Sequence, residues 1–164
     1  MPKVKKVRTH SDLDALRQAI LNKRLPDKQL IRVCCTTGCR AGGALEIVDA
    51  FEDELIAHGL EDKFEVKKTG CRGFCEKGPV IAIEPENLFY NKVKPKDIPK
   101  IVPETLLNGK YVNRLLYTDS ETKKKIKYEK DIPFFGKQVR NVFANTGKID
   151  PFSGPHPPRF DSNA

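Results

Sequence analysis

The sequence predicts a small α/β sandwich followed by an extension, and three observations support this fold class. First, helix-like and strand-like patterns alternate up to residue 110 in the order α-β-α-β-β-β-α. Second, the 164 residues suffice for one domain of ordinary size plus an appendage. Third, 38% of the residues are hydrophobic and 12 are prolines, so we expect a modest core with part of the chain outside it.

The first half of the sandwich is expected to contain two helices and two strands. Apolar residues recur at helical spacing over 12–23, with Ser11 as the expected N-cap. The apolar run 30–34 predicts a strand that leads into the first cysteines. The strongest amphipathic pattern predicts a helix over 42–58, ended by Gly59, and 64–67 alternate like a half-buried strand.

The second half is expected to hold a β-hairpin and a last helix. Residues 80–83 form a continuous apolar run and 88–90 a second one, and the four residues between them suit a turn. A helix is predicted from Lys94 to Gly109. Its inward-facing apolar residues are expected to be Ile98, Ile101, Val102 and Leu106.

The extension differs in character from the sandwich. Residues 115–117 and 126–128 flank a polar turn and predict a ribbon. Asp131 is placed to cap a short helix that has Pro133 in its first turn and ends at Gly147. One side of this helix is expected to carry Phe135, Val139, Val142 and Phe143. Residues 151–164, with four prolines, are predicted to be irregular.

The distribution of charge and apolar residues excludes some function classes. Residues 30–91 hold 7 basic and 11 acidic side chains, whereas 92–148 hold 14 and 6. Aromatic residues do not interleave with these lysines as a base-stacking surface requires, so we expect no nucleic-acid binding. No run of 18 apolar residues and no apolar stretch after the basic N-terminus occur, so we expect no membrane insertion and a cytoplasmic location.

The five cysteines fall into two clusters, Cys34, Cys35 and Cys39, and Cys71 and Cys75. In a reducing compartment this pattern favours metal or redox chemistry over disulfides. Four residues separate Cys34 from Cys39 (or three separate Cys35 from Cys39), and three separate Cys71 from Cys75. Zinc sites commonly use shorter spacings, whereas these wider ones suit a two-iron cluster whose irons each take two thiolates. A zinc-stapled interaction module and a thioredoxin-like thiol oxidoreductase remain alternatives.

Other side chains near the cysteines have two interpretations each. Arg40 and Arg72 could offset the negative charge of a cluster or form ordinary surface salt bridges. Phe74 could shield a cluster from water or fill the core. Several glycines allow backbone amides to approach the sulfur atoms: Gly38, Gly42, Gly43, Gly70, Gly73 and Gly78. No catalytic base is apparent, because the three histidines are isolated and expected at the surface: His10, His58 and His156.

The segments 33–43 and 69–79 around the cysteines resemble the thioredoxin-like [2Fe–2S] ferredoxins. The resemblance covers about residues 25–110 and implies a thioredoxin-like sandwich that binds one [2Fe–2S] cluster. It also implies a cis peptide bond before Pro79, beside the metal loops. Cys35 departs from the family pattern and is expected to be spare or to point into the core. The ligands that the resemblance implies are Cys34, Cys39, Cys71 and Cys75.

Residues 114–151 resemble the entry segment of the flavin-bearing, NADH-oxidising subunit of complex I and of its soluble relatives, which include bifurcating hydrogenases and formate dehydrogenases. This implies an electron-transfer subunit, not catalytic alone, that carries one electron at a time within an NAD(P)H/flavin-linked oxidoreductase complex. The implied partners are flavin/NADH-binding and other iron–sulfur subunits, and a homodimer is also compatible. The chain itself has no G-x-G-x-x-G nucleotide loop, so we do not expect it to bind flavin or NADH.

These patterns divide the chain into four parts. An N-terminal helix (1–24) precedes the ferredoxin domain (25–110), which is followed by a docking arm (111–150) and an irregular tail (151–164). The arm offers more apolar surface than one ribbon and one short helix can bury, so we expect it to be ordered on another chain.

Overall fold

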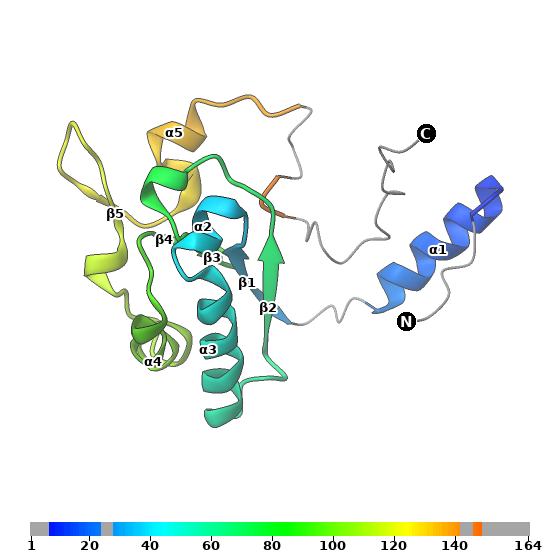
Figure 1. Ribbon diagram of the computed structural model, residues 1–164, viewed down its shortest axis with the longest axis horizontal. Coiled ribbons are helices and arrows are strands. Elements are labelled where there is room, and N and C mark those ends of the chain that lie inside the picture. The colour runs from blue at the N-terminus through cyan, green and yellow to red at the C-terminus, as the bar shows by residue number, and fades with distance from the viewer. Residues whose placement is uncertain (1–6, 24–27, 142–145, 149–164) are drawn as a thin grey trace, which may run out of the picture.

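The computed structural model describes residues 7–23, 28–141 and 146–148 and has an α/β fold (Figure 1). Its α-helices are α1 (His10–Lys23), α2 (Thr37–Ala41), α3 (Ala44–Ala57), α4 (Ile98–Ile101) and α5 (Pro133–Gly136). Its strands are β1 (Gln29–Cys34), β2 (Phe64–Thr69), β3 (Ile81–Ile83), β4 (Leu88–Tyr90), β5 (Tyr117–Thr118) and β6 (Lys125–Ile126). The predicted order of helices and strands up to residue 110 is therefore confirmed, with α2 added.

A four-stranded sheet in the order β2-β1-β3-β4 forms the centre of the fold. β1 pairs parallel with β2 and antiparallel with β3, and β3 forms the predicted hairpin with β4. Helix α3 contacts β1, β2 and α4 through one buried apolar stripe, as its amphipathic pattern predicts: Ala44, Ile47, Val48, Phe51 and Leu55. This helix ends as expected, because Gly59 has a left-handed backbone, with φ of 62°, that glycine adopts without strain.

The N-terminal helix begins at His10, two residues before the predicted start at residue 12. The amide of Asp12 donates to Oγ1 of Thr9 at 3.1 Å, and the Asp12 carboxylate accepts from the amide of Thr9 at 3.0 Å. This reciprocal arrangement is a capping box, so Thr9 is the cap and the expectation for Ser11 is wrong. Leu13 and Leu16 are exposed, and Figure 1 shows α1 lying apart from the sheet.

The last helical segment of the sandwich covers the predicted range but is not α-helical throughout. A 3-10 turn (Pro95–Asp97) precedes α4, and a π-helical segment (Val102–Leu107) follows it. Proline has no amide hydrogen, so Pro103 cannot make the α-helical bond to the carbonyl four residues earlier. Gly109, with φ of 62°, ends the segment as expected.

The extension forms the predicted ribbon, but its helix is shorter than predicted. α5 has four residues and its cap is Ile132 rather than Asp131. Val139 is 90% exposed and not helical, while Val142 and Phe143 lie outside the described residues. Gly136 and the β-branched residues beyond it are weak helix formers, which accounts for the early end.

Residues 112–135 pack on the sandwich of the same chain. The carbonyl of Lys127 accepts from the amide of Phe89 at 2.7 Å, and the carbonyl of Leu115 accepts from the amide of Asn91 at 2.9 Å. The core includes five side chains of this segment: Val112, Leu115, Leu116, Tyr117 and Ile132. The sandwich of the same chain thus buries apolar side chains of the extension that we expected another chain to cover. The boundary at residue 110 and the docking role remain predictions.

Candidate metal centre

The two cysteine clusters meet at one edge of the sheet. Cys34 is the last residue of β1 and lies opposite Thr69, the last residue of β2. Because β1 and β2 are parallel, their carboxyl ends and the loops that follow lie side by side. Cys39 lies in α2, Cys71 lies in the loop after β2, and Cys75 begins the 3-10 turn that follows this loop (Cys75–Lys77).

The thiols form an inner and an outer pair. In the inner pair, Cys34 and Cys39 are each 1% exposed. In the outer pair, Cys71 is half-buried and Cys75 is exposed, and their Sγ atoms are 3.6 Å apart. A Cβ atom placed on Gly78 would lie 2.9 Å from Sγ of Cys39 and 3.1 Å from the carbonyl oxygen of Cys75. A residue without a side chain at this position thus lets the two pairs approach.

Two pairs suit two metal ions better than one. A structural zinc ion takes about four ligands around one centre, whereas each iron of a two-iron cluster takes two thiolates. The observed donor set therefore fits a two-iron cluster.

Hydrogen bonds between the thiols shift the pKa values of Cys34, Cys39 and Cys75. The bond from the Cys39 thiol, assisted by Thr36 and the amide of Arg72, lowers the pKa of Cys34 to about 5. The same bond raises the pKa of Cys39, and the bond with Cys71 raises the pKa of Cys75. The amide of Gly73 also donates to Sγ of Cys71 at 3.2 Å. Such N–H···S bonds stabilise negative charge on sulfur.

Cys35 is fully buried and lies against α3. Its Sγ contacts the carbonyl oxygen of Ala44 at 4.0 Å. Cys35 packs within the hydrophobic core cluster, as expected for a side chain that points into the core, and its absence from the ligand set remains a prediction.

The structure distinguishes the alternatives for Arg72 and Phe74. Arg72 is 3% exposed, forms an ion pair with Glu129 and donates to the carbonyl of Gly147 at 2.9 Å. This ion pair is therefore not an ordinary surface salt bridge. Phe74 is buried and stacks on Phe134 with ring centroids 4.7 Å apart, so it fills the junction between the outer pair's loop and the extension. The sequence offered no signal for Glu129 or Gly147, because both reach the loop from far along the chain.

The remaining sequence expectations concern Pro79, Arg40 and the histidines. The Gly78–Pro79 peptide bond is cis, as predicted. Arg40 is exposed. His10 and His58 lie near carboxylates of their own helices, at 3.1 Å from Asp14 and 3.4 Å from Glu54. His156 lies outside the described residues.

Comparison with known proteins identifies the family. The model of the thioredoxin-like [2Fe–2S] ferredoxins matches residues 19–106, more than half of the chain. The chain belongs to this family. A [2Fe–2S] ferredoxin of Clostridium pasteurianum is 36% identical over 98 residues, which cover 54% of this chain and 94% of that protein. The crystal structure of the thioredoxin-like [2Fe–2S] ferredoxin from Aquifex aeolicus is 27% identical, with a TM-score of 0.51, and covers 57% of this chain and 99% of its own.

A further relative extends beyond the family-model range. The NADP-reducing hydrogenase subunit HndB of Solidesulfovibrio fructosivorans is 25% identical over 120 residues, covering 70% of this chain and 94% of that protein. This ferredoxin therefore combines the thioredoxin-like fold with one [2Fe–2S] cluster and is an electron carrier. The family assignment decides against the zinc and thiol-redox alternatives. None of the helices among the described residues has the length and apolar character that crossing a bilayer requires.

Proposed function

We propose that this ferredoxin is the electron-transfer subunit of an NAD(P)H/flavin-linked oxidoreductase complex, with its cluster held by Cys34, Cys39, Cys71 and Cys75. The observation that carries this proposal is the arrangement of four thiols as two pairs at one sheet edge, one pair buried and the other reaching the surface. When bound, a [2Fe–2S] cluster accepts and returns one electron at a time.

The chain's own groups prepare the site for the added negative charge of the reduced state. Backbone amides of Arg72 and Gly73 donate to sulfur atoms of the two pairs. The buried Arg72 side chain lies next in sequence to Cys71, where a positive charge favours reduction. The buried inner pair excludes water, while the exposed Cys75 gives a partner access to the surface nearest the thiols.

Membership in a complex is supported by the extension and by the hydrogenase-subunit relative. The match to that relative spans 120 residues and so extends past the sandwich. Phe134 lies over Gly73, since a Cβ there would be 3.6 Å from its ring, and 37% of Phe134 is exposed. An exposed aromatic side chain beside the outer pair suits contact with a partner protein.

The ligand set is tested by comparing Cys34→Ser with Cys35→Ser. We expect Cys34→Ser to lose the cluster and Cys35→Ser to keep it. Visible absorption, iron and sulfide counts, and EPR after dithionite reduction measure the outcome. Loss of the cluster in Cys35→Ser with an unchanged cluster in Cys34→Ser would reverse the assignment, and a colourless wild-type protein with bound zinc would refute the iron–sulfur site.

Complex membership is tested by purifying the tagged full-length chain from its native cells. We expect a flavin-containing protein to co-purify, and the cluster EPR signal to appear when NADH or NADPH is added. Using the two nucleotides separately distinguishes the donor. A flavin-free preparation whose cluster stays oxidised with both nucleotides, yet is reduced by dithionite, would contradict the proposed complex and leave the electron carrier intact.

A further inference from the structure

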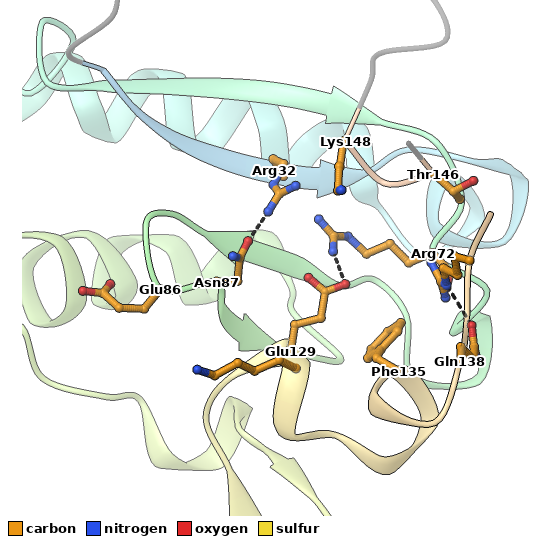
Figure 2. Close-up of a pocket in the computed structure, with 11 residues that line it drawn as sticks. Arg32, Arg72, Glu86, Asn87, Glu129, Phe135, Gln138, Thr146 and Lys148 are labelled. Atoms are coloured by element: carbon orange, nitrogen blue, oxygen red, sulfur yellow. Dashed lines mark hydrogen bonds and ion pairs between the residues drawn. The ribbon is translucent and has the colours of Figure 1, made fainter. Parts of the chain in front are cut away.

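A cavity of about 450 Å³ lies beside the metal centre, where the extension passes near the sheet (Figure 2). Its walls come from β1, the β3–β4 turn, the loop after β2 and residues 129–140 and 146–148 of the extension. Neither thiol pair lines it, so it is a separate feature of the fold. Its volume is in the range of small-molecule pockets, about 300–1,000 Å³.

Two buried arginines reach this cavity. Arg32, on β1, is 6% exposed, and Arg72 is 3% exposed. The Nε atom of each is buried and has no hydrogen-bond partner among the described residues. The remaining nitrogen atoms of Arg32 contact Asn87 and Glu84, and those of Arg72 contact Glu129 and the carbonyl of Gly147. A buried, unpaired N–H group is costly, so both side chains have unused capacity to bind a ligand.

The lining of the cavity has excess positive charge. Five cationic side chains face two carboxylates, Glu86 and Glu129. Figure 2 shows Arg32, Arg72 and Lys148 extending into the same space, with the Glu129 carboxylate paired to Arg72. Burial, and next the charge of Arg72, lower the pKa of Arg32, which is the effect expected of cations held close together.

The shape and charge of this cavity favour a multiply charged anion. Guanidinium groups present paired N–H donors that match the oxygen atoms of phosphoryl groups. Phe135 lines the same cavity, and the guanidinium of Arg140, another lining residue, lies 5.5 Å from the centroid of its ring. We propose that the cavity binds a phosphoryl-bearing small molecule, with its phosphoryl oxygen atoms held by Arg32, Arg72 and Lys148.

Binding of an anion at this site is expected to affect the cluster. This part of the proposal rests on the ligand set proposed above. Arg72 is adjacent to Cys71, and its amide donates to Sγ of Cys34. An anion on the Arg72 side chain offsets a positive charge that otherwise favours reduction. The bound anion therefore lowers the midpoint potential, and by linkage the reduced protein binds the anion more weakly than the oxidised protein.

Isothermal titration calorimetry of the full chain with inorganic pyrophosphate and, separately, ADP tests the proposal at constant ionic strength. We expect saturable binding of one anion per chain. Lys148→Ala, which removes an exposed side chain, should weaken binding about tenfold. Lys124→Ala is the matched control, because it removes the same charge from the β5–β6 turn and should leave the affinity nearly unchanged.

Equal weakening by Lys148→Ala and Lys124→Ala would overturn the site, because it indicates a diffuse response of a basic protein. Binding without saturation would do the same. Tighter binding of citrate than of pyrophosphate would replace the phosphoryl ligand with a carboxylate. Tighter binding of ADP than of pyrophosphate supports a nucleotide source. A midpoint potential that stays constant at saturating pyrophosphate would overturn the coupling to the cluster.

Discussion

The inner and outer thiol pairs belong to one site but have different surroundings. Cys34 and Cys39 are each 1% exposed, whereas Cys75 reaches solvent and Cys71 is half-buried. Water stabilises an added negative charge, and burial opposes it. The reducing electron is therefore expected to favour the iron at the outer pair. On the proposed ligand set, we infer that the inner pair anchors the cluster and that the outer pair exchanges electrons.

The largest difference is expected between Cys39→Ser and Cys75→Ser. Cys39→Ser should lose the cluster, since neither water nor a movable side chain can replace a ligand in the buried position. Cys75→Ser should retain an altered cluster, because the new hydroxyl or water can complete the coordination at the exposed position. Iron counts and EPR measure both. Equal loss in the two variants would show that exposure does not distinguish the pairs.

A second test acts on the contact between the pairs. Gly78→Ala places a Cβ 2.9 Å from Sγ of Cys39, so the inner and outer loops must move apart. We expect a loss of about 1–3 kcal/mol in the free energy of unfolding, with reduced cluster content. Gly70→Ala is the control, because its Cβ would meet nothing within 4 Å. Thermal unfolding that is the same for both variants would contradict the close approach.

The ion pair behind the outer loop provides a third test. Glu129→Gln leaves the buried Arg72 charge uncompensated, so we expect a loss of about 1–2 kcal/mol in stability. The freed positive charge should raise the midpoint potential by up to about 60 mV, a tenfold change for one electron. Glu104→Gln is the control, since its 3.7 Å pair with Lys100 is exposed. A lowered potential in Glu129→Gln would show that Arg72 does not act on the cluster by its charge.

The smallest effect is expected at the aromatic cover of the outer loop. Phe134→Ala removes a ring that stacks on Phe74, and should cost about 1 kcal/mol of stability. It should also speed the removal of iron by a chelator, because the ring lies over Gly73 next to the outer pair. Val139→Ala, at a 90% exposed position, should leave both measurements unchanged. Unchanged chelation by Phe134→Ala would exclude a protective role for the ring.

The sequence predicted the parts of this fold that depend on local pattern. Strand and helix periodicity placed β1, α3 and the β3–β4 hairpin, and the strand predicted over 30–34 leads into the first cysteines as expected. The helix after Asp131 was overestimated, since helix length depends on propensity and packing together. α2 was missed because five residues carry too little periodicity to be recognised.

The contacts around Arg72 could not be predicted in the same way. Glu129 and Gly147 lie 57 and 75 residues further along the chain. Only the path of the extension over the sandwich brings them to the loop after β2. The sequence alone therefore gave Arg72 two equal interpretations, and three-dimensional packing separated them.

The small size of α2 has a consequence for how the holoprotein is assembled. Five residues make little more than one helical turn, and the cap residue Thr36 makes no side-chain hydrogen bond to this helix. So short a helix has almost no intrinsic stability. In the cluster-free chain α2 is therefore the segment expected to unfold locally while the sheet remains intact. On the proposed ligand set, such an opening would give an incoming cluster access to Cys39 and closure would bury that thiol again, so the same five residues would serve both assembly and protection of the site.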